Sequence, residues 1–483
     1  MAEQRYRFGP LERRGLLLGL RLGQLAVMIG GCTVAVCMLA VSTSPAAITG
    51  ALVALGGGVT VAVLPIAGRT ADEWMPTCTS WLWRTVSGER RHLSRAHHRG
   101  HIADGTTLLT PPADPPPPLR GVSIFSAPLP HGADMGVVKD ALSGTYTAVI
   151  AVRGSGFALL DEHDQARRLA WWGGLLDGLS RDGGHVQRVQ WIERAIPETS
   201  DGLVAYLNEH CTPGDESTVV QSYRELVSGA AASTQRHETY LAVQIRMSSS
   251  RRAIRQAGGG DRGACTVLER ELTALWSQLG SGEVTVDGIL GPRHLATVLR
   301  SAADPACVDT PPDFCCPTAT VVSWRSYRTD GGLHATYWVR EWPRMDVGAD
   351  VLAPLLLQTT ARRTVAMTMQ VEPPLRAQRE AEAALTADLA DDDVRRRGGF
   401  ITGFRRQREQ ENVVRRGEEI ADGHASVRFS AYVTVTAATV EELEEACADV
   451  EQRAQQSQLQ LHRLVGEQDV AWTYTLPLGR GLR

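Results

Sequence analysis

Few side chains in this sequence have the types and spacing that phosphate chemistry needs. A phosphate-binding loop places a lysine directly after a glycine, where it reaches the β- and γ-phosphates, and follows it with Ser or Thr for magnesium. Lys139 is the only lysine among the 483 residues, and it lies in the sequence Val-Val-Lys-Asp. The sequence therefore excludes a phosphate-loop ATPase.

Three glycines, Gly258, Gly260 and Gly263, have the G-x-G-x-x-G spacing of dinucleotide-binding loops. That fingerprint works between a strand and a helix, because the helix N-terminus holds the pyrophosphate. Residues 251–256 have a helical pattern instead. We therefore expect these glycines to form a loop between two helices.

The sequence also contains no motif typical of nucleophilic or metal-dependent catalysis. No serine lies in G-x-S-x-G, and H-E-x-x-H does not occur. The nine cysteines contain no C-x-x-C, and Cys315 and Cys316 are adjacent, so we expect reduced, packed thiols and no zinc site. The acidic pair Asp161-Glu162 is interpreted as a helix start, and 391–393 as a solvated face. We expect no catalytic residue, no cofactor and no metal ligand.

The basic residues do not give the chain the positive electrostatic potential that is typical of nucleic-acid-binding proteins. The formal net charge is −4, and the arginine clusters are interpreted as solvated helical surface. These clusters are Arg395 to Arg397, Arg405-Arg406 and Arg415-Arg416. Four histidines at 92, 97, 98 and 101 lie in a basic linker, where contact with anionic headgroups is favoured over metal binding. Direct nucleic-acid binding is not expected.

The element that must position the rest of the chain is an uncharged stretch from Leu22 to Gly68. It holds two apolar runs, Leu25–Val41 and Ala46–Ala67, joined by the turn Ser-Thr-Ser-Pro. Each run is about long enough to cross roughly 30 Å of hydrocarbon as a helix. A link this short makes the two helices antiparallel. The sequence therefore predicts a transmembrane hairpin over residues 25–68.

Arginines flank the hairpin on both sides, which by the positive-inside rule places both termini in the cytoplasm. Trp74, Trp81 and Trp83 follow the second run, where an interfacial aromatic belt is expected. Two alternatives are a secretory signal peptide in the first run and a buried hairpin in a soluble protein. The predicted location is the plasma membrane, with residues 1–24 as a cytoplasmic segment.

Residues 69–118 are interpreted as a juxtamembrane segment and a proline-rich linker. Two cytoplasmic α+β domains with mainly antiparallel sheets are predicted after it, over 119–303 and 304–483. The Asp-Gly turn at 330–331 predicts a hairpin of 318–328 with 333–342. Further expected strands are 146–152, 156–160, 186–192, 238–247, 363–371, 427–436, 459–465 and 470–476.

The hairpin with its tryptophans and arginines resembles the small, PrgI-like inner-membrane subunit of type IV secretion systems of Gram-positive bacteria. The soluble part resembles the N-terminal, non-ATPase region of TraC/TrbE/CagE-type secretion ATPases. The stretches that carry this resemblance are 146–152, 171–179, 190–197, 238–243, 431–435 and the Leu-Pro-Leu-Gly at 476–479. In that family a segment of this kind leads into the ATPase domain, whereas this sequence ends at residue 483.

The resemblance implies an actinobacterial conjugation or secretion subunit. We expect a non-enzymatic, membrane-anchored scaffold that docks a separate secretion ATPase, contacts other envelope subunits and forms a homo-oligomer. An EccE-like subunit of type VII secretion is the nearest alternative, since it also joins a membrane hairpin to a cytoplasmic domain. An alternative of another class is a membrane-tethered enzyme or ligand-binding regulator with an unfamiliar site. Cargo and stoichiometry are not specified by the sequence.

Overall fold

The computed structural model describes most of the chain. The described residues are 22–42, 44–63, 69–94, 115–129, 132–154, 156–180, 184–197, 209–210, 217–231, 235–281, 284–307, 316–357, 361–397, 414–415, 417–421 and 425–482. They divide into two compact units. One unit comprises Arg90–Ala377 with Gly423–Arg483, and the other comprises Pro10–Glu89 with Gln378–Asp422.

The smaller unit contains the predicted apolar hairpin as two helices, α1 (Leu22–Val41) and α2 (Pro45–Val63). Pro45 occupies the first turn of α2, where its missing N–H costs nothing. A third helix, α3 (Ala71–Val86), follows and carries the three tryptophans. The long helix α11 (Pro374–Arg397) begins at the second proline of the pair at 373–374, as the sequence predicts, and from Gln378 onward it belongs to this unit.

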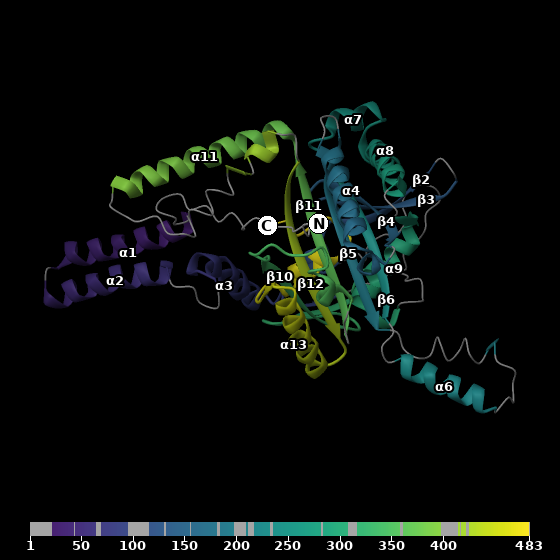
Figure 1. Cartoon of the computed structure of the whole chain (residues 1–483). Helices are drawn as coiled ribbons and strands as arrows, with labels where there is room; N and C mark the ends of the chain where they lie inside the picture. The colour runs from purple at the N-terminus through teal and green to yellow at the C-terminus, as the bar shows by residue number, and fades with distance from the viewer. Residues whose placement is uncertain are drawn as a thin grey trace. The chain divides into compact units, whose positions relative to one another are not determined.

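A single sheet of 13 strands forms the larger unit (Figure 1). Its main order is β1-β8-β9-β10-β12-β11-β5-β6-β4-β3-β2, with β13 added to β10 and β7 to β4, and every pairing is antiparallel. The strands are β1 (Arg91–Leu93), β2 (Val122–Pro128), β3 (Asp134–Asp140), β4 (Thr145–Arg153), β5 (Val186–Pro197), β6 (Gln235–Arg246), β7 (Thr285–Ile289), β8 (Ala319–Val322), β9 (Tyr327–Arg328), β10 (Leu333–Glu341), β11 (Arg362–Glu372), β12 (Ser426–Ala437) and β13 (Gln460–Arg463). The α+β class and the mainly antiparallel sheet are thus confirmed.

The sheet runs without interruption across both halves of the soluble chain. β5 from the first half pairs with β11 from the second, in a register that extends from Ala195 opposite Arg363 to Arg188 opposite Gln370. The proposed division into domains at 303/304 stays a prediction, but the strands on either side of it share one hydrogen-bonded ladder.

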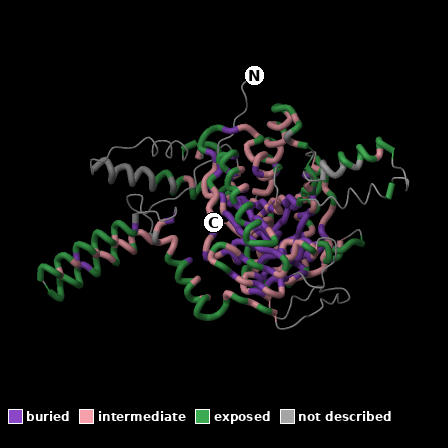
Figure 2. Tube along the Cα trace, turned by 90° about the horizontal axis from the view of Figure 1, so that it is seen from below, coloured by how far each residue is buried: buried purple, intermediate pink, exposed green. Residues whose placement is uncertain are grey.

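One face of the sheet is apolar and is covered by helices. Cross-strand neighbours point to the same face, so Val433, Val365 and Met369 lie on the side covered by α4 (Glu162–Ser180), α8 (Gly260–Ser281) and α13 (Val440–Gln456). Figure 2 shows the buried residues gathered in this unit. Burial of these aliphatic side chains is the main stabilising term of the fold.

The opposite face of the sheet is richer in polar side chains, including Gln190, Gln244, Thr368 and Thr434. It is covered by α9 (Pro292–Ala303), α14 (Gln468–Trp472), the 3₁₀ turn η4 (Thr473–Thr475) and the chain end. Smaller elements are α6 (Thr218–Ala231), α7 (Arg251–Gln256), α10 (Ala353–Leu357), and the 3₁₀ turns η1 (Pro117–Leu119), η2 (Phe157–Leu159) and η3 (Pro305–Cys307).

Two expected strands are wrong. Residues 156–160 form η2 because Gly156 adopts a positive φ of 35° and breaks the extended path. Residues 470–476 form α14 and η4 despite their alternating pattern. The helical turn places the Gln468 amide against the β10 backbone, where it accepts from Thr336 N at 2.8 Å and donates to Thr336 O at 3.2 Å.

Candidate functional site

The apolar hairpin is the first candidate for function. Gly23–Val41 and Pro45–Ala62 are long and apolar enough to cross a membrane, and little of either is buried within the protein. The helices approach closely at two glycines: a Cβ on Gly58 would lie 3.2 Å from the Gly31 Cα. Small residues are typical of such contacts between membrane helices. Membrane-spanning helices are thus supported by length, composition and packing.

Polar groups of the hairpin are satisfied internally, which a membrane requires. Thr33, Thr49 and Thr60 each donate a hydrogen bond to the carbonyl four residues earlier, at 2.7–2.8 Å. Gln24 donates across the helix pair to the Ala62 carbonyl at 3.0 Å. On α3, Trp83 is 72% exposed. An exposed tryptophan next to two apolar helices matches the expected interfacial belt.

The only lysine is engaged in a structural ion pair. Lys139 Nζ lies 2.9 Å from both carboxylate oxygens of Asp261, and the Tyr146 hydroxyl donates to the same carboxylate at 2.7 Å. Burial raises the pKa of Asp261, but these two donors outweigh it and hold that pKa below its usual value. The group therefore fixes the start of α8 against β3 and β4.

The glycine motif lies where the helical pattern predicts. Gly258 and Gly259 have positive φ angles of 106° and 71° between α7 and α8. Gly263 is required for a different reason, since a Cβ there would lie 2.3 Å from the Ile254 carbonyl oxygen. Gly258 and Gly259 thus form a tight turn between helices, Gly263 within α8 allows close packing against α7, and the element directly before the motif is the helix α7.

The remaining predicted residues are distributed as follows. Asp161 accepts from the Asp164 N–H at 2.8 Å and starts α4, as expected. The described cysteines, 32, 37, 78, 265, 307, 316 and 447, are free thiols. No group of three or more His, Cys, Asp or Glu suited to a metal is found within the described part of the chain. His97, His98, His101, Cys315, Arg405 and Arg406 lie outside the described residues, as do the side chains at 391–393 and 395–397.

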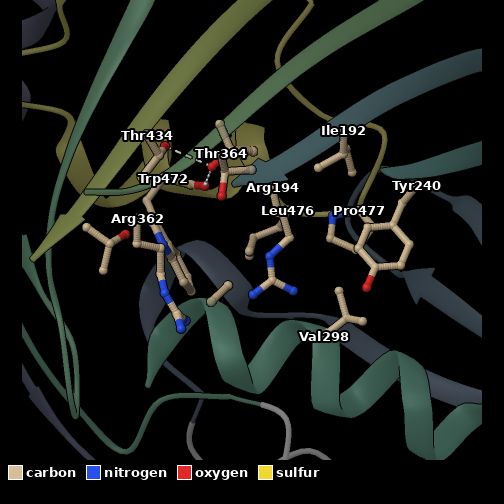
Figure 3. A pocket seen from close by; sticks show the side chains of 13 residues that line it. Ile192, Arg194, Tyr240, Val298, Arg362, Thr364, Thr434, Trp472, Leu476 and Pro477 are labelled. Atoms are coloured by element: carbon tan, nitrogen blue, oxygen red, sulfur yellow. Dashed lines mark hydrogen bonds between the residues drawn. The ribbon is translucent and has the colours of Figure 1, made fainter. Parts of the chain in front are cut away.

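A small cavity lies on the polar face of the sheet, in the larger unit. It measures about 20 Å³ and is bounded by β5, β6, β11 and β12, by α9 and by the segment from Trp472 to Pro477. Figure 3 shows the guanidinium groups of Arg194 and Arg362 directed from the sheet toward α9. The space suffices for about one water-sized particle. It is too small for a nucleotide or a metabolite.

Two arginines line this cavity, of which Arg194 is buried and Arg362 is half-buried. Arg194 is 5% exposed; its Nη1 lies 3.2 Å from Glu238 Oε2, and its Nη2 donates to Ser301 Oγ at 2.8 Å. Arg362 donates to the carbonyls of Ser301 and Pro305 at 3.1 and 3.4 Å. Burial, followed by repulsion from Arg194, lowers the pKa of Arg362 to about 10.

Polar side chains of the same face hold the chain end. Gln190 donates to the Tyr474 carbonyl at 2.7 Å and accepts from Gly479 N at 2.8 Å. Gln244 donates to the Leu478 carbonyl at 2.9 Å, and Thr368 donates to the Arg480 carbonyl at 2.7 Å. The Leu-Pro-Leu-Gly segment therefore packs on the sheet as part of the fold.

Sequence reasoning missed the arginine pair and the polar face. In the strands that contain Arg194 and Arg362, side chains alternate between the two faces of the sheet, and each arginine shares its face with threonine or glutamine. This alternation is a signal from which a polar face could have been predicted. The meeting of the two arginines depends on the β5–β11 register, because Thr364 lies opposite Arg194. That pairing has no local sequence signature.

Comparison with known proteins gives one family match. The model of the EccE family, a putative type VII ESX secretion system translocon component, matches residues 233–339. This segment contains β6 to most of β10, including α7, α8 and α9. A comparison with curated proteins gave no match.

Proposed function

We propose that this chain is a membrane-anchored, non-enzymatic subunit of a type VII secretion translocon. The EccE match over residues 233–339 is the observation that carries this assignment. The two apolar helices support it, since a translocon subunit works in a membrane. The alternative identified from the sequence is therefore better supported than the type IV resemblance, on which no comparison bears.

The proposed role is that of a scaffold. The cavity beside Arg194 and Arg362 is too small for a metabolite, and the two residues at its wall with strongly shifted pKa values, Tyr240 and Arg362, hydrogen-bond within the protein. In this proposal the hairpin holds the subunit in the inner membrane, with both termini in the cytoplasm. The sheet unit contacts other translocon subunits, among them a separate ATPase, and copies of the chain assemble with one another.

The test is an affinity purification of the tagged full-length chain from gently solubilised membranes of its host, with identification of co-purifying proteins by mass spectrometry. We expect the membrane components of a type VII system and its ATPase. A matched variant lacking residues 22–63 should leave the membrane fraction and lose the membrane components. Crosslinking of the full-length chain in the membrane measures self-association.

Other outcomes would redirect the assignment. Recovery of type IV subunits in place of type VII subunits would overturn the proposal in favour of the first resemblance. Membrane localisation without any secretion subunit would favour a tethered enzyme or regulator. A thermal-shift screen with nucleotides and divalent metals tests that alternative, because a ligand that binds the native state raises its melting temperature. We expect a flat screen.

A further inference from the structure

The helix α3 carries an uncharged stripe of side chains that are exposed in the structure. Met75, Thr79, Leu82 and Val86 recur at spacings of four, three and four, so they share one face of the helix. Met75, Leu82 and Val86 are 61–81% exposed. Trp83 lies at the border of this stripe. A row of exposed large apolar side chains indicates an interaction surface.

Another side of α3 is used for packing. Trp74, Thr77 and Trp81, at spacings of three and four, form a stripe that is buried or half-buried. The helix contacts both α1 and α2. At its first turn the approach is close, since a Cβ on Gly23 of α1 would lie 2.6 Å from the Asp72 Cβ. The exposed stripe therefore takes no part in the packing of α3 on the hairpin.

The contact with Gly23 places the beginning of α3 at one end of the hairpin. Gln24 donates to the Ala62 carbonyl, so the start of α1 and the end of α2 are neighbours there. The two helices have 20 and 19 residues, which at about 1.5 Å per residue matches the roughly 30 Å of the hydrocarbon layer. When the hairpin spans a bilayer, α3 therefore begins at the membrane surface.

The charges of α3 suit the surface of a bilayer and not its interior. Between Met75 and Val86 the only charged residue is Arg84, and it lies on the side of the helix away from the exposed stripe. A helix with one uncharged apolar face and a polar opposite face is typical of segments that lie in the membrane interface. Tryptophan is enriched at that depth, and Trp83 borders the stripe.

We propose that α3 lies along the surface of the phospholipid bilayer that the hairpin spans, with Met75, Thr79, Leu82 and Val86 inserted between the headgroups and the outer parts of the acyl chains. The inference rests on the proposed membrane attachment of the hairpin. Lipid is the partner because α3 packs on two helices whose own exposed side chains are apolar, and because lipid accepts an uncharged face without a complementary charge. The direction of α3 is then fixed relative to the membrane.

The test uses the full-length protein in nanodiscs of phosphatidylcholine and phosphatidylglycerol, made with ordinary acyl chains or with chains that carry bromine near the headgroup. Bromine quenches tryptophan fluorescence on contact. The contribution of Trp83 is the difference in emission between the wild type and Trp83→Phe, and brominated lipid should remove most of it. Trp276→Phe is the matched control: Trp276 of α8 is partly exposed in the larger unit, and its contribution should be equal in both kinds of disc.

Two variants test whether the exposed stripe makes the contact. Leu82→Glu places a carboxylate on the stripe, whereas Ser80→Glu places the same group four residues before Arg84, on the polar side of the helix. Both positions are exposed, so neither change disturbs the packing of α3. Each variant is compared with its own Trp83→Phe partner. Leu82→Glu should restore most of the Trp83 emission in brominated discs, and Ser80→Glu should leave it quenched.

A Trp83 contribution that is equal in brominated and ordinary discs would overturn the proposal and leave the stripe to a protein partner. Equal quenching of Trp83 in Leu82→Glu and the wild type would also overturn it, because the contact would not depend on the stripe. Quenching of Trp276 as strong as that of Trp83 would do the same. Protein that does not co-purify with the discs would instead refute the membrane attachment of the hairpin, on which this inference rests.

Discussion

Asp330 is the side chain whose loss should most clearly expose how the sheet is held together. It lies in the turn between β9 and β10 and is 11% exposed. Its carboxylate accepts from the backbone N–H groups of Thr318 and Ala319, at 3.0 and 2.7 Å, and from the Thr318 hydroxyl at 2.9 Å. It also pairs with Arg300 of α9. One carboxylate thus ties a turn, the start of β8 and a helix together.

The change Asp330→Asn keeps the size of this side chain and removes its charge. One oxygen acceptor becomes an amide donor that faces other donors, while Arg300 keeps its ion pair with Asp304 at 3.2 Å. Hydrogen bonds to charged groups contribute about 1.5–3 kcal/mol each, and breaking a buried pair costs up to about 5 kcal/mol. Because the pair is not fully enclosed, we expect the free energy of unfolding to fall by about 2–4 kcal/mol.

The pH dependence gives a second signature of the same carboxylate. Burial raises the pKa of Asp330, but its backbone and side-chain donors outweigh burial and lower that pKa. A carboxyl whose folded pKa lies below its unfolded value of about 3.9 stabilises the fold fully above that value. This stabilisation is lost as the pH falls through the folded pKa. The difference between wild type and Asp330→Asn should therefore shrink below about pH 4.

The assay is urea unfolding of the full-length protein in a non-ionic detergent, followed by tryptophan fluorescence at pH 7 and at steps down to pH 3. Asp287→Asn is the matched control, since Asp287 pairs with the exposed Arg153; its effect should be far smaller. A loss below about 0.5 kcal/mol for Asp330→Asn, or a loss equal to that of the control, would refute the reasoning from burial and hydrogen bonding.

Three further changes test other parts of the molecule. Trp472→Ala should lower the free energy of unfolding by about 3–5 kcal/mol in the same urea assay, because the indole is 2% exposed and packs on two other rings. His334 is fully buried, and burial lowers its pKa to about 3. The neutral ring therefore stabilises the fold fully above an unfolded pKa of about 6.5, and this term is lost at up to about 1.4 kcal/mol per pH unit below it; a variant His334→Gln should lack that slope between pH 6 and pH 4. Gly58→Leu should reduce the amount of protein in the membrane fraction because the side chain would meet Gly31, whereas Gly56→Leu, with no atom within 4 Å, should not.

The sequence predicts best those features that depend on contiguous residues. The hairpin follows from two uninterrupted apolar runs, and α1 and α2 match them within a few residues at the described ends. α13 follows from its apolar stripe, and Thr439 with Glu442 forms the capping box at its start. Local periodicity and local caps suffice for such elements.

Features that depend on pairing between distant strands could not be predicted from local sequence patterns. β1 lies within the segment that the sequence predicts to be a linker, and it pairs with β8. A strand of three residues is too short to show a recognisable alternation, so it was not predicted. Nothing in the sequence of β5 or of β11 indicates that these two strands pair with each other. The arginine pair at the cavity depends on that ladder, and so the candidate site could not be found before the register was known.

The continuous ladder between β5 and β11 also bears on how the larger unit responds to force. A hinge needs a few residues that absorb backbone rotation between stiff bodies. Eight consecutive residue pairs join the two halves instead, and bending there would rupture a row of hydrogen bonds at once. We therefore expect the two halves of the sheet to move together as one stiff body.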